Sequence, residues 1–117
     1  MAGGLYVADT ANNQVREVAA ASGTQWAQQM TAGDIYTVAG STAGTAGNSG
    51  TGGPAGAALL NFPIDVGTDP AGDVFIPDLD SDTVLEAVTT ATPGFPVSLA
   101  SARITDTASR QSTRAPA

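Results

Sequence analysis

The sequence predicts an all-β protein built from short antiparallel strands, and three observations lead to that prediction. A stretch near residue 4 recurs near residue 73, and both copies are rich in β-branched and aromatic residues. Apolar and polar residues alternate in these copies with a period of two, as they do in a strand with one buried face. The segments between them are rich in Gly, Asn, Asp and Pro, which are the residues that turns require.

The repeat keeps its register over a shift of 69 positions. The shift superimposes six pairs of the same physical type: Leu5 and Val74, Tyr6 and Phe75, Val7 and Ile76, Asp9 and Asp78, Val15 and Val84, and Glu17 and Glu86. Repetition over tens of residues is typical of solenoids and propellers, whose units bury apolar faces against their neighbours. We therefore interpret the two copies as neighbouring structural units.

The first copy predicts a hairpin followed by a third strand. The hairpin strands are "LYVA" at 5–8 and "QVREV" at 14–18, and the turn between them, "DTANN", contains Asn and Asp residues that adopt turn conformations at low cost. A further strand is expected in "DIYTVAG" at 34–40. Segment 19–33, rich in Ala, Ser and Gln, is expected to be a loop.

The second copy predicts a meander of three or four strands. Its hairpin joins "VFIP" at 74–77 to "TVLEA" at 83–87 through the turn "DLDSD". A preceding strand is expected in "FPIDVGTD" at 62–69, followed by a type I turn over residues 69–72. Either "FPVSL" or "ARITD" supplies the last strand, and the rest of 89–117 is expected to be a flexible tail.

Four antiparallel strands per unit are typical of the blade of a β-propeller. Known four-stranded repeats recur at roughly 40 to 45 residues. The longer spacing here comes from loop 19–33 and from segment 40–56, in which seven of 17 residues are Gly. A propeller needs roughly 4 to 8 blades to close its ring, and this chain supplies about 1.75.

At these residues the chain closely resembles bacterial NHL-repeat proteins, a family of six-bladed propellers. The resemblance is carried by "LYVADTANNQVREV", by "GDIYTVAG" and by the segment from Ser49 to Val88, in that order. Departures from the family pattern fall at Gln14, Thr51, Asp65, Gly67, Pro77 and Thr83. Pro77 is the most consequential, because a proline inside a central strand removes a ladder hydrogen bond. We therefore interpret the second copy as eroded.

The resemblance divides the chain into four segments. Residues 1–40 are expected to form an incomplete first blade with the inserted loop 19–33, and 41–60 a glycine-rich loop between blades. Residues 61–105 are expected to form the second blade, and 106–117 a disordered tail. Because the chain starts and stops at different points of the repeat, we expect a fragment of about two blades from a longer repeat protein. Three copies that assemble into a six-bladed ring are the alternative.

The resemblance implies a non-enzymatic scaffold or binding module that holds a protein or carbohydrate ligand through its blade loops. Relatives also include lyases and hydrolases, so the alternative is part of a propeller enzyme whose catalytic residues lie outside this chain. Many bacterial relatives of this type are exported, which implies an extracellular or cell-envelope location. The N-terminus itself does not have the pattern of a signal peptide.

The composition excludes several kinds of site. The 117 residues contain no Cys, His or Lys, which rules out thiol or imidazole metal ligands, a Ser-His-Asp triad and a Schiff-base lysine within this chain. The net charge of −7 disfavours nucleic acid and anionic membrane partners, since both need a cationic surface. We therefore expect no catalytic residue, no cofactor, no nucleic acid partner and no membrane association.

One acidic motif is a candidate for calcium. Asp78, Asp80 and Asp82 alternate as the ligands at the start of a calcium loop do. The sixth position of such a loop is Thr83 instead of Gly, and the twelfth is Thr89 instead of Glu. We therefore expect a hairpin turn here and keep the three aspartates as a calcium candidate that the rest of the loop does not support.

A glycine motif and an aromatic pair complete the candidates. Residues 50–55, "GTGGPA", satisfy the pattern of a dinucleotide loop, but Pro63 follows too soon for the helix that such a site needs. Trp26 and Met30 are four residues apart and would share a face in one turn of helix. We expect the pair to pack over the end of the sheet, and we keep it as a candidate for partner binding.

Overall fold

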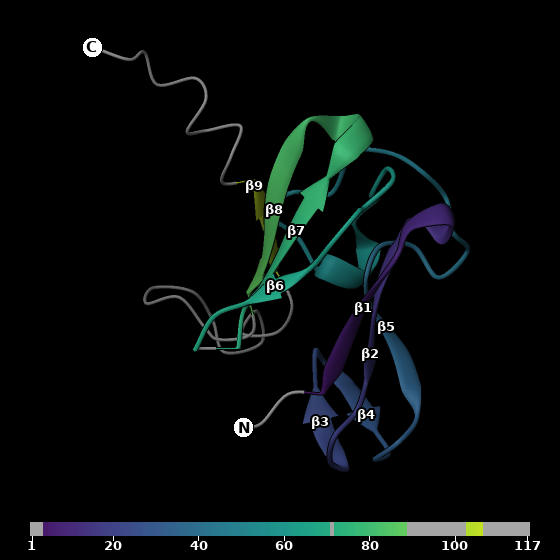
Figure 1. Ribbon diagram of the computed structural model, residues 1–117, viewed down its shortest axis with the longest axis vertical. Helices are drawn as coiled ribbons and strands as arrows, with labels where there is room; N and C mark the ends of the chain where they lie inside the picture. Colours follow the sequence, from purple (N-terminus) through teal and green to yellow (C-terminus); the bar gives the residue numbers. More distant parts are fainter. Residues whose placement is uncertain (1–3, 71, 89–102, 107–117) are drawn as a thin grey trace.

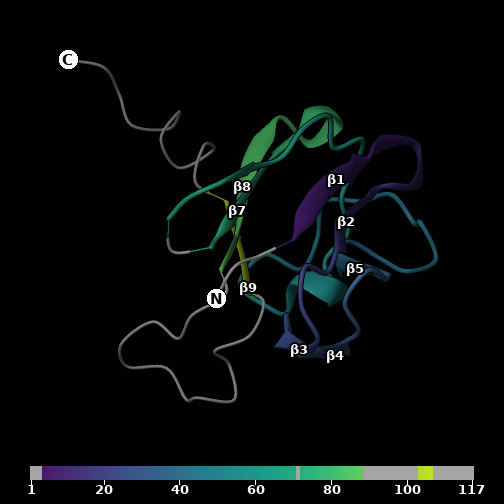
Figure 2. The same cartoon turned by 60° about the horizontal axis from the view of Figure 1, so that its bottom comes forward.

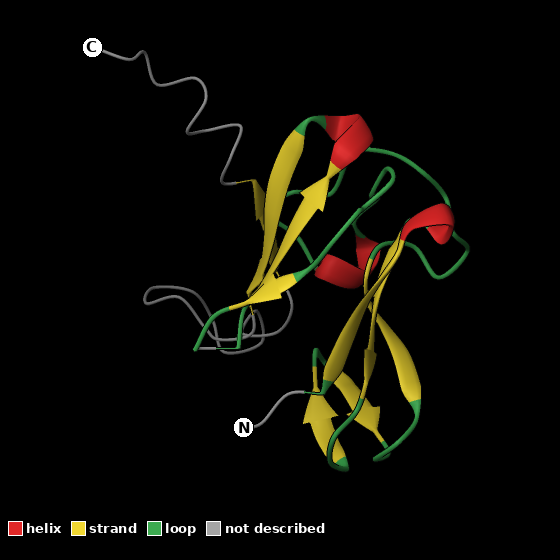
Figure 3. Ribbon diagram, in the orientation of Figure 1, coloured by secondary structure: helices red, strands yellow, loops and turns green. Residues whose placement is uncertain are grey.

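In the computed structural model, which describes residues 4–70, 72–88 and 103–106, strands and three short 3₁₀ turns make up the secondary structure (Figures 1 and 3). The strands are β1 (Leu5–Asp9), β2 (Gln14–Val18), β3 (Gly23–Gln25), β4 (Gln28–Met30), β5 (Ile35–Ala39), β6 (Gly67–Thr68), β7 (Val74–Asp78), β8 (Thr83–Val88) and β9 (Arg103–Asp106). The 3₁₀ turns are η1 (Thr10–Asn12), η2 (Ala55–Ala57) and η3 (Leu79–Ser81). The expected all-β class is confirmed. The described residues include no helix of the length and apolarity that a membrane span needs.

Two antiparallel sheets carry most of the strands. The first sheet has the order β1-β2-β5, and the second is a meander in the order β6-β7-β8-β9. Of the two alternatives for the last strand, "ARITD" supplies it as β9, while "FPVSL" and residues 107–117 lie outside the described part of the chain. β6 is shorter than the strand expected at 62–69, because Phe62 adopts left-handed backbone (φ 67°) and only an isolated bridge joins Pro63 to Asp78.

The shift of 69 residues also holds in three dimensions. β1, η1 and β2 of the first sheet correspond to β7, η3 and β8 of the second. Both η1 and η3 end in a left-handed residue, Asn13 at φ 57° and Asp82 at φ 56°. After Gly, Asn and Asp are the residues that adopt this conformation most readily. The two hairpins therefore have the same turn for the same chemical reason.

Segment 19–33 contains a hairpin where a loop was expected. β3 and β4 pair antiparallel, and the two residues that connect them, Trp26 and Ala27, have φ values of 52° and 59°. Positive φ at both central positions is the mark of a type I′ turn, whose twist matches that of the flanking strands. The helical turn expected for Trp26 and Met30 is therefore wrong: the hairpin pairs the backbone groups that a single helical turn would leave open. Figure 2 shows the hairpin at the end of the first sheet, beneath β5.

Side chains alternate along the strands and give each large sheet two faces. The front face of the first sheet carries Leu5, Val7, Arg16, Val18 and Ile35, and its back face carries Tyr6, Ala8, Val15, Glu17 and Tyr36. At the equivalent positions, the front face of the second sheet carries Val74, Ile76, Leu85 and Ala87. Its back face carries Phe75, Pro77, Val84 and Glu86.

The apolar core joins the back face of the first sheet to the front face of the second. One cluster of buried side chains unites Val15 and Val38 with Val74 and Ile76, none of them more than 1% exposed. The linker between the sheets adds three buried residues of its own to this cluster: Ala55, Ala58 and Leu60. The two sheets are therefore stacked in the same sense, with the back of one against the front of the next.

Pro77 does not interrupt the ladder between β7 and β8. Its carbonyl accepts a hydrogen bond from the Ile64 N–H at 3.1 Å, on the opposite side of the strand from β8. Because the N–H and C=O positions of one strand residue point to the same neighbour, the missing N–H also faces the 63–66 segment. The expected loss of a central ladder bond is therefore wrong, and the proline lies where pairing is already sparse.

The side-chain amide of Asn13 connects the first hairpin turn to the second unit. Its Nδ2 donates to the Gly44 carbonyl at 3.1 Å, and its Oδ1 accepts from the Phe62 N–H at 2.8 Å. Gln14 continues the connection, because its Nε2 donates to the Ser41 carbonyl at 2.8 Å. One left-handed residue thus satisfies backbone groups of two distant segments.

We predict that Asn13→Gly lowers the free energy of unfolding by about 1–3 kcal/mol, since Gly keeps the left-handed backbone but removes both amide bonds. Denaturant unfolding followed by circular dichroism measures the change. Asp82→Gly at the equivalent, exposed turn position is the matched control and stays within about 0.5 kcal/mol of the parent. Equal losses in the two variants would show that the amide contributes nothing.

Gly40 follows β5 at a point of close backbone approach. Its φ is 92°, its N–H donates to the Ala55 carbonyl at 3.0 Å, and a Cβ there would collide with the Asn13 carbonyl. Gly52 has nearly the same φ, 91°, but open space around the Cβ position. Substituting each glycine with Ala therefore distinguishes the cost of backbone strain, which both share, from the cost of a collision, which only Gly40 has.

We predict that Gly52→Ala costs about 1 kcal/mol of stability through backbone strain alone. Gly40→Ala costs at least about 1 kcal/mol more, because the backbone must also move away from Asn13. Thermal and denaturant unfolding of the two variants measure the difference, and equal destabilisation would contradict the collision.

Candidate functional site

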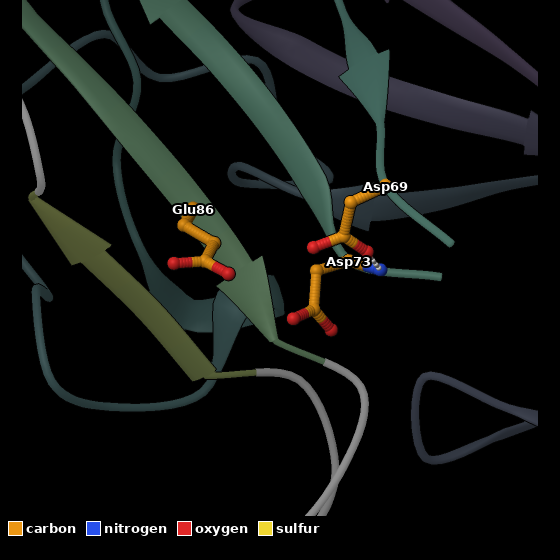
Figure 4. Close-up of side chains that lie close together, drawn as sticks. All are labelled: Asp69, Asp73 and Glu86. Atoms are coloured by element: carbon orange, nitrogen blue, oxygen red, sulfur yellow. Dashed lines mark hydrogen bonds between the residues drawn. The ribbon is translucent and has the colours of Figure 1, made fainter. Parts of the chain in front are cut away.

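Three carboxylates converge at the turn between β6 and β7. Asp69, Asp73 and Glu86 place one oxygen each within 4.8 Å of one another. Figure 4 shows Glu86 on β8 facing Asp69 and Asp73, which come from the two sides of that turn. Asp69 Oδ1 also accepts the Asp73 N–H at 3.0 Å, and the Asp69 carbonyl accepts the Gly72 N–H at 2.9 Å, as the expected type I turn requires.

The repeat explains why acids meet here. Glu86 corresponds to Glu17, and Asp73 corresponds to Gly4. In the first sheet Glu17 is completely buried, and its Oε2 accepts the Gly4 N–H at 2.9 Å. In the second sheet the residue at the position of Gly4 carries a carboxylate, so the same glutamate faces a like charge. The shift of 69 aligns Gly4 with Asp73, so the acid pair could have been found from the sequence. It was missed because only positions of the same residue type were compared.

The cluster alters the acidity of Glu86. Burial raises the pKa of its carboxyl group, and the Asp73 carboxyl and the charges of Asp73 and Asp69 raise it further. Such a cluster can share a proton, and its oxygens are ligands that a hard cation accepts. Three carboxylates supply only part of the six to eight oxygens that calcium takes.

We predict that stability depends on the ionisation of Glu86. Because its pKa is raised by folding, the folded state binds the proton more tightly, and stability falls as pH rises through that pKa. Glu86→Gln therefore stabilises the protein at neutral pH by up to about 1 kcal/mol, and the gain disappears below about pH 4. Denaturant unfolding over a pH series measures it.

Asp34→Asn is the charge-matched control, since Asp34 is exposed and lies outside the cluster. We expect this variant to lack the gain at neutral pH that Glu86→Gln shows. A Glu86→Gln variant without this gain would show that the three carboxylates do not interact.

A second polar site lies around Asp78. It is a pocket of about 140 Å³ between the glycine-rich linker and the turn between β7 and β8. Its lining residues are Asn48, Ser49, Thr51, Ala58, Leu59, Asp78, Ser81, Thr83 and Leu85. Asp78 is only 1% exposed, and its Oδ1 accepts the Asn61 N–H at 2.8 Å. The aspartate therefore binds backbone, as a structural residue of the repeat does, and also borders a pocket.

Three oxygens of this pocket have unmet hydrogen-bonding capacity. Asp78 Oδ2, Ser81 Oγ and Thr83 Oγ1 are buried and have no hydrogen-bond partner among the described residues. Burial raises the pKa of Asp78, while the Asn61 N–H and the nearby Ser81 hydroxyl offset part of that effect. The Ser81 hydroxyl lies close enough to favour the charged form, although its geometry falls short of a hydrogen bond.

The structure separates the aspartates of the calcium candidate. Asp78 turns inward to the Asn61 N–H, whereas Asp80 and Asp82 are exposed on and after η3. Among the described residues, the acidic group whose ligand atoms converge is instead the one at Asp69. The 3₁₀ turn separates the three aspartates, because residues two positions apart in such a turn point in different directions.

The candidates for partner binding, Trp26 and Met30, lie in the core. Trp26 is 6% exposed and Met30 is 1% exposed. The Trp26 ring meets the Tyr6 ring edge-on at a centroid distance of 6.4 Å, and its Nε1 donates to the Tyr6 hydroxyl at 3.1 Å. Burial raises the pKa of Tyr6. The hairpin thus covers the back face of the first sheet, which is the packing role expected for this pair.

The remaining motif residues form loops and turns. Residues 50–55 lead into η2, a 3₁₀ turn of three residues, so the long helix of a dinucleotide site does not follow them. Asp9 accepts the Asn12 side-chain amide at 3.0 Å, whereas its counterpart Asp78 binds a backbone N–H. Sequence reasoning missed Asn13, Ser81 and Thr83, whose importance depends on segments that lie far away in the chain.

Compared with known protein families, with characterised proteins and with solved structures, the chain matches none of them. The two sites described above are therefore the basis on which its function is argued.

Proposed function

We propose that this chain is a non-enzymatic binding module, made of two consecutive units of an NHL-type β-propeller, that holds its ligand through the loops at one end of the second unit. The repeat of β1-η1-β2 as β7-η3-β8 and the back-to-front stacking of the sheets support the blade interpretation. Two units are too few to close a ring, so further units must complete the propeller. By the same resemblance we place it outside the cell or in the cell envelope.

The observation that carries the binding function is the unpaired Oδ2 of Asp78 in its pocket. A buried acceptor without a partner costs about 1–3 kcal/mol, and a ligand that donates a hydrogen bond recovers this free energy. The Ser81 and Thr83 hydroxyls lie at the same place and can both donate and accept. The pocket therefore suits a ligand that presents several hydroxyl groups.

The rest of the lining favours a carbohydrate over a peptide at this pocket. Ala58, Leu59 and Leu85 supply an apolar wall for the carbon-bound hydrogens of a sugar, while Asn48 and Ser49 add polar groups at the rim. The pocket has a volume of about 140 Å³. That volume accommodates part of one sugar ring rather than a folded segment of protein.

We predict that a panel of neutral hexoses contains at least one ligand that binds at this pocket with millimolar affinity. Isothermal titration calorimetry measures the affinity, and saturation-transfer NMR identifies the bound hydrogens. Asp78→Asn keeps the acceptor for the Asn61 N–H but removes Oδ2 as an acceptor, and it weakens binding about tenfold or more. Thr83→Val, which keeps the side-chain shape, weakens it in the same direction.

The matched control is Asp80→Asn, which removes a charge from an exposed residue of the same turn. It leaves binding unchanged. The absence of saturable binding to every sugar in the panel would overturn the proposal, as would binding that neither pocket variant affects.

A further inference from the structure

The front face of the first sheet exposes a patch of apolar side chains. Leu5 is 66% exposed, Ile35 is 44% exposed and Val7 is 37% exposed. The three lie on one face of the sheet, on the two strands that flank β2, because Leu5 pairs with Val18 and Val18 pairs with Ile35. Neighbouring apolar residues exposed in this way mark an interaction surface.

Matched positions in the second sheet are buried. Val74, which corresponds to Leu5, and Ile76, which corresponds to Val7, are both 0% exposed. Leu85, which corresponds to Arg16, is 6% exposed. The apolar residues of β1 and their counterparts on β7 thus have opposite environments in the two units.

The cause of the difference is stacking. The front face of the second sheet is covered by the back face of the first and by the linker, which together form the core. The front face of the first sheet lies at the opposite side of the stack. What it lacks is the back face of another unit of the same kind.

Arg16 adds a charge argument. It is the single basic residue before position 103, it lies on this front face, and its buried Nε has no hydrogen-bond partner among the described residues. The back face of the second sheet carries Glu86, beside which Asp73 and Asp69 converge. The front face of the first sheet and the half-buried back face of the second are therefore opposite in charge as well as partly apolar.

We propose that the front face of the first sheet docks the back face of the second sheet of another copy of this chain, head to tail. The contact repeats between copies the stacking that the chain already makes within itself. This inference rests on the blade interpretation proposed above, but not on the sugar ligand. Because each copy uses two different faces, the association is heterologous, and three copies supply six units, within the roughly 4 to 8 that close a propeller.

Light scattering and sedimentation from micromolar to millimolar concentration test the proposal. We expect a species of three times the 11.5 kDa chain mass. Leu5→Asp and Ile35→Asp change exposed residues and each weaken the association about tenfold or more, with an unchanged circular dichroism spectrum. Leu79→Asp, at an apolar position that is 49% exposed on η3 and outside this face, is the control and keeps the parent mass.

Mixing two variants tests the head-to-tail geometry. Leu5→Asp removes the front face of its copy, and Phe75→Asp removes the back face of its copy, so each variant alone is monomeric. A mixture forms a dimer, because the Leu5→Asp copy keeps an intact back face and the Phe75→Asp copy keeps an intact front face. A parent that stays monomeric throughout, a Leu5→Asp variant with the parent mass, or a mixture without dimer would overturn the proposal.

These outcomes are independent of the ligand. The sugar pocket at Asp78 lies between the linker and the turn after β7, not on the front face of the first sheet. Failure of self-association with intact sugar binding would leave the binding function standing, and the reverse result would leave the docking surface standing.

Discussion

The stacking of the two large sheets depends on the side chain of Asn13. The segment that connects the sheets is rich in glycine, and its buried apolar residues Ala55, Ala58 and Leu60 lie near its C-terminal end, so hydrogen bonds hold its earlier part. Asn13 makes two hydrogen bonds, one to the Gly44 carbonyl and one from the Phe62 N–H. Its left-handed backbone is what directs the amide to both segments. A β-branched residue at this position would lose the conformation and the bonds together.

Equivalent residues of the two units have different roles because their neighbours differ. Glu17 receives a backbone N–H from Gly4, while Glu86 meets the carboxylate of Asp73 at the matching place. Asp78 binds the Asn61 N–H, which precedes it by 17 residues. Its counterpart Asp9 instead accepts a hydrogen bond from the side-chain amide of Asn12. A repeat therefore conserves the strand positions more closely than the chemistry of its polar groups.

The fold was largely predictable from local pattern, and the sites were not. Alternation of apolar and polar residues predicted β1, β2, β5, β7 and β8, because a strand with one buried face has this pattern within its own sequence. The hairpin of β3 and β4 was missed, since a type I′ turn at Trp26 and Ala27 lacks the usual Asn-Gly signal. The pocket at Asp78 was missed because the linker, some 20 to 30 residues earlier, forms half of its wall.

The sequence by itself determined that this protein is all-β, that it repeats a hairpin over 69 positions, and that it has no thiol, imidazole or lysine chemistry. These properties depend on residue identity and on short-range periodicity. Only the tertiary structure decided which carboxylates converge, which of Leu5 and Val74 is exposed, and which oxygens of Asp78 remain unpaired. Burial and hydrogen-bond pairing depend on contacts between segments that are distant in the sequence. These contacts exist only after the sheets have stacked, so local sequence patterns do not reveal them.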